Sequence, residues 1–523
     1  MKRKKIKKNS RANKYNIKFK KHSLNYLILM SHKKIKTRIF CQYCKAPLTS
    51  KQEIRQQAHT NCKKEIEGNS ANKNVIEWLK SLIISLEEIN FGFTYVRLDN
   101  LDETIVQQID YLSLENPINT LKYLPECISQ LINLKILNIQ SNQLESIPSS
   151  IGKLSHLEEL SLRSGLFDLP DTIGNLSNLT HLGLSQNRLR SIPDTIGNLS
   201  NLTHLGLEIN QLQSIPDSIG NLLNLKQLSL GGNQLVKLPP SMGNLINLLR
   251  LYLDFNKLTS LPDIFGPMKD LEILTIHNNN LVSLPESFGN LTKLREINLD
   301  NNKLTALPKF IGQFKTNSIS VKNNSLLSLP ETIGNLKYLY ELHLEHNYLT
   351  ELPNSFSEFL NLRILNLTQN KLKTIPKAIM YLKLKEFILE QNELTELPSF
   401  IGRVSSLEWL SLRDDKIETI PDSIGNLHLL TYLHLGENPI SYLPTNITDL
   451  YNLKELILNN TLITELPESI FKLKNLKRLK LLNVPLKSLP LILKEINTLE
   501  SITLSKNANT TIPKDLENKI IYY

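Results

Sequence analysis

The stretch Leu202–Leu222 reads LTHLGLEINQLQSIPDSIGNL, and its pattern decides the fold of the chain. Leu205 and Leu207 flank Gly206 with the period of two that is typical of a short β-strand, so both leucines point to the same face. Pro216 has no N–H and cannot lie inside a strand ladder, so it predicts the beginning of one or two helical turns. We therefore expect each such stretch to form one strand followed by one outer turn.

This pattern recurs along most of the chain. Proline stands at 18 positions that are 22 or 23 residues apart, from Pro125 to Pro513. A fixed period of this length is typical of a solenoid, in which each unit buries its leucines only against its neighbours. The sequence predicts an α/β solenoid of about 17–18 repeats with a parallel inner sheet over residues 105–515. Residues 516–523 are expected to form a C-terminal tail.

Two further positions of the repeat have predicted roles in the backbone. Asn210 follows the strand, where its amide can bond backbone groups of the turn. The equivalent position is Asn in 13 of the 17 repeats after the first. Gly220 follows the helical turn, and we expect it to adopt the positive φ that glycine tolerates best.

The run L-P-x-x-I-G-N-L identifies a resemblance to a known family. It occurs at residues 329–336 and, with Phe288, at residues 284–291. This motif resembles the intracellular leucine-rich repeats of the scribble and Ras-binding scaffold type. It is also similar to the repeat portions of plant resistance proteins. The resemblance covers residues 105–515. It implies a leucine-rich repeat horseshoe with a non-enzymatic role and partners such as small GTPases, phosphatases or polarity proteins.

Three of the four cysteines lie close together near the beginning of the chain. Cys41, Cys44, His59 and Cys62 have the spacing C-x2-C-x14-H-x2-C. This spacing suits one tetrahedral Zn²⁺ held by three thiolates and one imidazole. Because protein ligands fill all four positions, we expect a structural ion in a module over residues 30–68, whose folding the metal drives. The alternative is that these are four ordinary residues that hold no metal.

The net charge of +11 is concentrated in residues 1–29. That segment has eleven lysines and arginines and no acid, and removing them from the 61 basic residues leaves 50 against 50 acidic residues. We interpret the segment as a basic disordered tail, with Met30 as an alternative translation start. The alternative is an arm that contacts nucleic acid or an anionic membrane.

The remaining sequence features bear on the cellular compartment and on the beginning of the solenoid. Residues 1–29 lack the apolar run of a secretory signal. The sequence contains no stretch of 18 apolar residues that could span a bilayer. Its four cysteines are too few for a disulfide framework. We therefore expect a cytoplasmic protein without a transmembrane segment. Within residues 69–104, the apolar spacing over residues 74–89 predicts a helix that caps the first repeat. The alternative is an amphipathic helix that binds a partner.

The inner face of the predicted sheet shows the x positions of L-x-x-L-x-L-x-x-N. The early repeats present small side chains there, whereas later repeats present the aromatic, arginine and acidic side chains that form binding hot spots. The first predicted patch consists of Arg250, Tyr252, Asp254, Phe255, His277, Asp300, Tyr340, His343, Glu345 and His346. The second predicted patch consists of Trp409, Arg413, Tyr432 and His434. The alternative is that these side chains decorate the sheet and bind nothing.

These observations favour a non-enzymatic scaffold that binds a folded protein on the concave face. The chain contains no phosphate-binding loop, dinucleotide fingerprint, zinc-protease motif or nucleophile elbow. The inner positions of the middle repeats carry more acidic than basic side chains, which is the wrong sign for a phosphate backbone. The alternative function is nucleic-acid binding through residues 1–29 and the zinc module.

We predict that the purified chain carries one zinc ion, because three thiolates and an imidazole at this spacing form a closed tetrahedral site. Metal analysis of protein that has never met a chelator measures the content directly. A content well below about half an equivalent would contradict the site.

Overall fold

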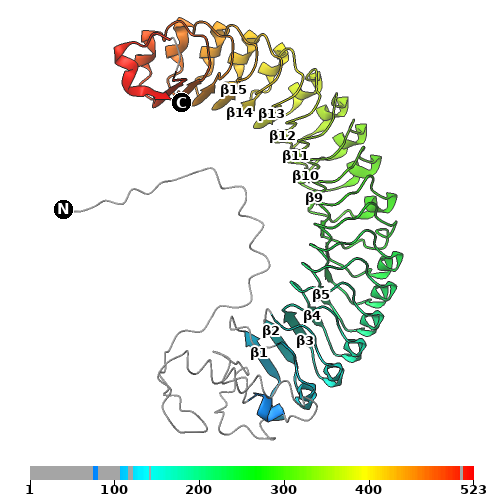
Figure 1. Ribbon diagram of the computed structural model, residues 1–523. Helices are drawn as coiled ribbons and strands as arrows, with labels where there is room; N and C mark the ends of the chain where they lie inside the picture. Colours follow the sequence, from blue (N-terminus) through cyan, green and yellow to red (C-terminus); the bar gives the residue numbers. More distant parts are fainter. Residues whose placement is uncertain (1–74, 80–105, 116–121, 141–142, 507–509) are drawn as a thin grey trace, which may run out of the picture. The chain divides into compact units, whose positions relative to one another are not determined.

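The computed structural model describes residues 75–79, 106–115, 122–140, 143–506 and 510–523. Within these residues, nineteen strands form one parallel sheet. The sheet lines the inner side of a curved stack of repeats, and short helical turns line its outer side (Figure 1). The predicted solenoid with a parallel inner sheet is therefore confirmed.

The strands follow one another in chain order, and each strand pairs with the equivalent strand of the next repeat. Their bounds are β1 Tyr111–Glu115, β2 Ile136–Gln140, β3 Glu159–Arg163, β4 His181–Gly183, β5 His204–Gly206, β6 Gln227–Ser229, β7 Arg250–Tyr252, β8 Ile273–Thr275, β9 Glu296–Asn298, β10 Ser318–Ser320, β11 Glu341–His343, β12 Ile364–Asn366, β13 Glu386–Ile388, β14 Trp409–Ser411, β15 Tyr432–His434, β16 Glu455–Ile457, β17 Arg478–Leu481, β18 Ser501–Leu504 and β19 Ile520–Tyr522.

The outer turns are 3₁₀ helices, and each begins directly after a periodic proline. Their bounds are η5 Glu126–Gln130, η6 Ser149–Lys153, η7 Asp171–Asn175, η8 Asp194–Asn198, η9 Asp217–Asn221, η10 Pro240–Asn244, η11 Glu286–Asn290, η12 Lys309–Gln313, η13 Glu331–Asn335, η14 Asn354–Glu358, η15 Lys377–Tyr381, η16 Ser399–Arg403, η17 Asp422–Asn426, η18 Thr445–Asp449, η19 Glu468–Lys472, η20 Leu491–Glu495 and η21 Lys514–Lys519. Elements this short adopt the tighter 3₁₀ geometry readily.

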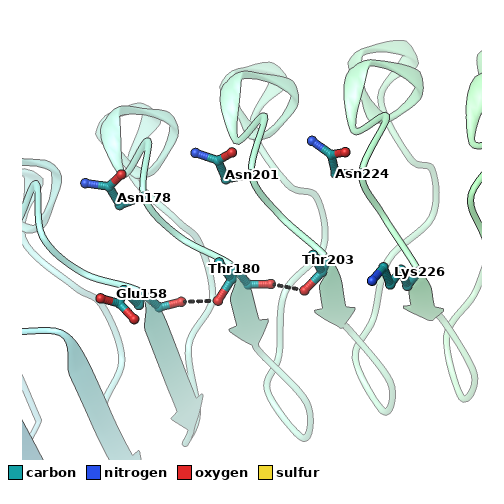
Figure 2. A pocket seen from close by; sticks show the side chains of 7 residues that line it. All are labelled: Glu158, Asn178, Thr180, Asn201, Thr203, Asn224 and Lys226. Atoms are coloured by element: carbon teal, nitrogen blue, oxygen red, sulfur yellow. Dashed lines mark hydrogen bonds between the residues drawn. The ribbon is translucent and has the colours of Figure 1, made fainter.

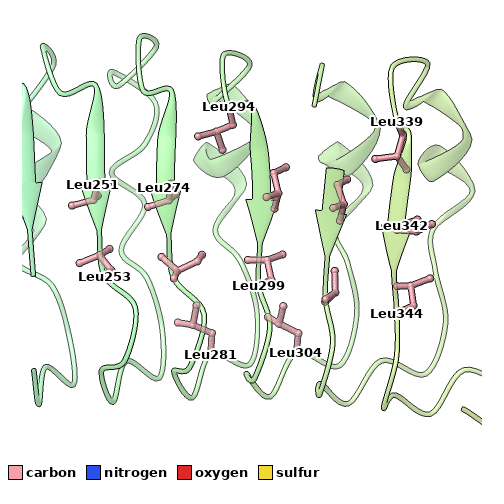
Figure 3. Close-up of a cluster of buried hydrophobic side chains, with 14 of the residues drawn as sticks. Leu251, Leu253, Leu274, Leu281, Leu294, Leu299, Leu304, Leu339, Leu342 and Leu344 are labelled. Carbon is pink, nitrogen blue, oxygen red and sulfur yellow. The ribbon is translucent and has the colours of Figure 1, made fainter. Parts of the chain in front are cut away.

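The core is a set of leucine columns that run through the stack. Leu205, Leu228 and Leu251 are partners in register on β5, β6 and β7, and all three are buried. Figure 3 shows the same arrangement farther along, where leucines of successive repeats lie next to one another behind the sheet. Because no repeat can bury this surface alone, stability comes from contacts between neighbours.

A buried asparagine in most repeats joins the strand to the turn, as predicted for Asn210. Its amide nitrogen donates to the carbonyl oxygens of Leu184 (2.9 Å) and Leu207 (3.0 Å), and its side-chain oxygen accepts from the N–H of Leu189 (3.0 Å). The same three bonds recur at Asn233, Asn256, Asn279 and Asn302. This ladder pairs buried backbone groups that would otherwise lack partners.

The predicted role of Gly220 is wrong. Among the described residues, Gly232 is the only glycine with a positive φ, whereas the residue before the ladder asparagine adopts that conformation in most repeats, as Ile209 does at 57°. Gly220 is required by close packing. A β-carbon there would lie 2.8 Å from Cβ of Ser241 in the next outer turn, and closer still to the Ser241 carbonyl oxygen.

Both ends of the described chain pack on the repeats. Residues 516–523, assigned above to a tail, contain the buried Leu516 and continue the sheet, since Ile520 of β19 pairs with Ile502 of β18. At the other end, residues 75–79 of the predicted capping helix are helical. Val75 is buried there, and its N–H donates to Oε1 of Gln130 in η5 (3.1 Å).

One ladder position carries an acid in place of the asparagine. Asp415 is buried, and its Oδ1 accepts from the N–H groups of Asn392 (3.0 Å) and Leu394 (3.4 Å). Its Oδ2 is also buried and has no hydrogen-bond partner among the described residues. Burial raises the pKa of Asp415 to about 8, with a smaller contribution from the charges of Asp414 and Glu390. Between about pH 4 and pH 8, Asp415 therefore keeps its proton in the folded state and loses it in the unfolded chain.

We predict that Gly220→Ala lowers the free energy of unfolding by roughly 1–3 kcal/mol, because the added methyl group overpacks the junction with Ser241. Gly243→Ala is the matched control, since a β-carbon there lies 3.6 Å from its nearest neighbour, Ile264, which is ordinary contact. Chemical denaturation of the two variants measures the difference. Equal loss in both would contradict the packing role.

We predict that Asp415→Asn stabilises the chain, and more so as the pH rises. The folded pKa lies above that of an unfolded aspartate near 3.9, so the stability of the parent protein is greatest below about pH 4 and falls until about pH 8. The amide has no such titration, and it restores donors that are worth about 1 kcal/mol each. Thermal unfolding from pH 5 to pH 9 measures the difference in stability between the variant and the parent protein. A difference that stays constant across this range would contradict the protonated state of Asp415.

Candidate functional site

The inner surface of the sheet changes character along the stack. On β4, β5 and β6 the middle inner position is occupied by Gly183, Gly206 and Ser229, which are in register with one another. Tyr252 on β7 is the first large side chain in this column, and His343 on β11 and His434 on β15 follow, whereas Ser320 and Ser411 remain small. The large side chains that can anchor a partner therefore begin at β7.

The first predicted patch begins with an aromatic group at β7. Phe255 has a positive φ of 53° and is 57% exposed, and its ring packs edge to face against His277 at 5.3 Å between centroids. Arg250 and Tyr252 lie beside it on β7, both partly exposed. Burial raises the pKa of Tyr252, so its hydroxyl remains a neutral donor over the physiological range. Asp254 accepts a hydrogen bond from the Thr275 hydroxyl (2.5 Å).

Two acids of this patch are bonded within the sheet. Asp300 Oδ1 accepts from the Ser320 hydroxyl (2.6 Å) and from the N–H of Lys322 (2.7 Å). Glu345 is only 7% exposed, and its Oε1 accepts from the Asn366 amide (2.8 Å) and pairs with Nζ of Lys322 (3.1 Å). These carboxylates hold neighbouring strands together.

His343 lies beside Glu345, and with Tyr340 and His346 it completes the first patch. Nδ1 of His343 lies 3.4 Å from Glu345 Oε1, and its Nε2 lies 3.7 Å from Glu341 Oε2. Burial alone would raise the pKa of Glu345, but the adjacent His343 ring and the charge of Lys322 outweigh burial and lower it. Tyr340, which is 43% exposed, and His346 extend into solvent.

The second predicted patch is a row of rings on β14 and β15. Trp409 and Tyr432 stack face to face, with centroids 3.5 Å apart and planes 11° apart, and His434 meets the edge of Tyr432 at 6.3 Å. Burial raises the pKa of Tyr432 to about 12 and lowers the pKa of His434. Arg413 pairs with Glu437 (2.9 Å). Of this patch, Trp409 offers the most exposed large apolar surface.

Several inner-face residues escaped the sequence analysis. Glu386 on β13 lies in register between Ile364 and Trp409. Glu455 on β16 is buried and pairs with Arg478 (2.5 Å) and Lys480 (2.8 Å). His181 and His204 stack at 4.4 Å on β4 and β5. These two glutamates and two histidines occupy the first position of their strands, so aligning that position across the repeats would have identified them.

A polar recess lies where the chain enters strands β4 to β6 (Figure 2). Its lining is a row of groups that already bond to the preceding repeat. The Thr203 hydroxyl donates to the carbonyl of Thr180 (2.9 Å), and the Asn201 amide donates to the carbonyl of Ser177 (2.9 Å). Asn178 and Asn224 make equivalent bonds. The recess is thus lined by a second, exposed asparagine ladder.

The predicted zinc ligands Cys41, Cys44, His59 and Cys62 lie outside the described residues. In the part of the chain that is described, no group of three or more His, Cys, Asp or Glu residues is placed to hold a metal ion. The described helices also include none with the length and apolar character needed to cross a bilayer. The aromatic and charged side chains described above make the inner face of the sheet from β7 to β15 the candidate site.

Comparisons with known proteins concern the repeats. The family profile described as "Leucine-rich repeat region" matches residues 191–311 and 422–518. Profiles described as "Leucine rich repeat" match residues 337–394 and 382–440, and also 133–154 and 178–199. No curated protein matches the chain.

Solved structures resemble the chain over about three quarters of its length. A leucine-rich repeat protein of Leptospira interrogans is 34% identical, with a TM-score of 0.58, and the match covers 74% of this chain and 95% of that one. The plant peptide hormone receptor RGFR1, solved in complex with RGF2, is 25% identical with a TM-score of 0.53 and coverages of 77% and 81%. The Drosophila Toll–Spätzle complex is similar in fold, at 22% identity, a TM-score of 0.58 and coverages of 77% and 56%.

Proposed function

We propose a function from one premise: the chain belongs to the leucine-rich repeat family. The proposed function is that of a scaffold that binds a folded protein through the concave surface of its sheet and catalyses no reaction. A stack of repeats offers an extended regular surface, which suits a macromolecular partner better than a small substrate. The similar plant receptor was solved with a bound peptide hormone, RGF2.

One observation carries this proposal: the inner face from β7 to β15 presents exposed aromatic side chains among charged ones. Phe255, Tyr340 and Trp409 project from strands or strand ends with 57%, 43% and 39% of their surface exposed. Exposed aromatic rings among charged groups are typical of binding hot spots. The leucine columns that stabilise the repeats lie on the opposite side of the same strands.

The finer parts of the proposal rest on the sequence. The resemblance to Ras-binding scaffolds makes a small GTPase the first partner to test, in a cytoplasmic signalling role. A structural zinc ion in residues 30–68 would stabilise a separate module. Nucleic-acid binding through residues 1–29 is the second candidate function, because all of the excess positive charge lies in that segment.

We predict that the double variant Phe255→Ala, Tyr340→Ala loses the protein partners that the parent chain retains from extract of its native cells, with affinities at least about tenfold weaker. The matched control is Tyr338→Ala, Tyr381→Ala, which removes two exposed rings at positions outside the inner face. Affinity capture followed by mass spectrometry compares the proteins. If the double variant still captures every partner, the assignment of the inner face is wrong.

The two candidate functions separate on a heparin column. Salt-sensitive retention that disappears when residues 1–29 are deleted would favour the nucleic-acid function. Retention of a specific protein that survives this deletion would favour the scaffold.

A further inference from the structure

The row of inner-face residues that crosses β12 to β15 contains a ring with one free face. Glu386, Trp409 and Tyr432 are consecutive partners in register, so their side chains stand next to one another on the concave surface. The stack of Trp409 on Tyr432 has parallel planes at 3.5 Å, so the ring normals point along the row. Tyr432 therefore covers the indole face toward β15, and the opposite face is turned toward Glu386.

The carboxylate of Glu386 differs from other half-buried or buried acids on this surface. Glu345 pairs with Lys322, and Glu455 pairs with Arg478 and Lys480. In contrast, no ion pair or hydrogen bond to the Glu386 side chain occurs within the described residues. Burial, followed by the charges of Glu341 and Glu408, raises the pKa of Glu386, as expected for a carboxylate without a counter-ion.

The basic side chains nearby are already engaged. Lys385 pairs with Glu408 (2.8 Å), Arg413 pairs with Glu437 (2.9 Å), and Arg363 donates to the carbonyl of Leu362 (3.0 Å). The strands β11 to β15 themselves contain Glu341 and Glu386 but no lysine or arginine, so acidic charge is in excess at their inner positions. A partner with a positive side chain would supply the charge that this part of the sheet lacks.

The surroundings of Glu386 favour arginine over lysine. Ile364 lies beside it on β12 and Ile388 lies two residues farther along β13, both half-buried. A guanidinium group is planar and weakly hydrated, so it can stack on an aromatic ring while it donates two hydrogen bonds to a carboxylate. An ammonium group would have to lose a tighter hydration shell in the same apolar setting.

We propose that Glu386 and the free face of Trp409 bind an arginine side chain of the protein partner. The guanidinium lies against the indole on the side opposite Tyr432 and donates to the Glu386 carboxylate, with Ile364 and Ile388 as apolar walls. This inference rests on the proposed function, because it assigns part of the same concave face to a basic segment of the partner.

The test uses the full chain and three fluorescein-labelled peptides of glycine and serine. The first contains three arginines, the second has lysine at these positions, and the third has citrulline, the neutral isostere of arginine. We expect the arginine peptide to bind most tightly in fluorescence anisotropy at physiological ionic strength. Glu386→Gln should weaken it about tenfold, the value of one charge-assisted hydrogen bond.

The matched control is Glu296→Gln on β9, which removes the same charge from another inner-face acid for which the described residues provide no ion pair. It should change the affinity by less than about twofold, because screening confines the effect to nearby charges. Labelling with 5-fluorotryptophan adds a local signal, since the chain has only two tryptophans and Trp409→Phe assigns one resonance. The arginine peptide should shift the Trp409 resonance.

Three results would overturn the arginine site: equal binding of the arginine and citrulline peptides, equal effects of the two glutamine variants, or an unchanged Trp409 resonance. Each of these results leaves the scaffold function intact if the double variant Phe255→Ala, Tyr340→Ala still loses its protein partners. Conversely, the arginine site stands if the peptides behave as expected while that double variant captures every partner, and the broader assignment of the face then fails.

Discussion

A backbone that reverses direction after every short strand leaves carbonyl groups inside the protein without partners, and the buried asparagine amides meet this need. Asn210 bonds three backbone groups of two repeats, and the equivalents at later positions do the same. The preceding residue takes a left-handed conformation, which turns the chain away from the sheet. This arrangement sets where each strand ends, and with it which side chains reach the inner surface.

The constant strand register turns sequence separation into spatial contact. Residues 22 or 23 positions apart become neighbours on the inner face, which produces the stack of Trp409 on Tyr432 and the pairing of Arg478 with Glu455. Opposite charges in adjacent repeats cancel within the sheet. The proposed contacts for a partner are side chains whose exposed surface or charge the sheet leaves available, such as the ring of Phe255 and the carboxylate of Glu386.

Much of the fold follows from local pattern, whereas the detail of the site depends on neighbours. The alternation around Gly206 and the position of Pro216 correctly predict a strand and an outer turn. The role of Gly220 could not be predicted, because glycine after a turn fits both a left-handed cap and a close approach, and only Ser241 in the next repeat decides. The pattern places Trp409 and Tyr432 in one patch, whereas the stacking of their rings is seen only in the structure. The engagement of Asp300 and Glu345 inside the sheet depends on Ser320, Asn366 and Lys322, whose reach across strands the pattern does not reveal.

The glycine contacts between outer turns bear on whether the stack can accept an added or a lost repeat. Gly174 meets Thr195, Gly197 meets Ser218 and Gly220 meets Ser241 in nearly the same geometry, so these units are interchangeable modules. Unequal crossing-over between such units would add or remove a whole coil without disturbing either junction. At Gly289 the neighbour is the ring of Phe310, so the junction between these two outer turns has a different geometry. An added unit would therefore fit more readily at a junction such as that of Gly197 than at that of Gly289.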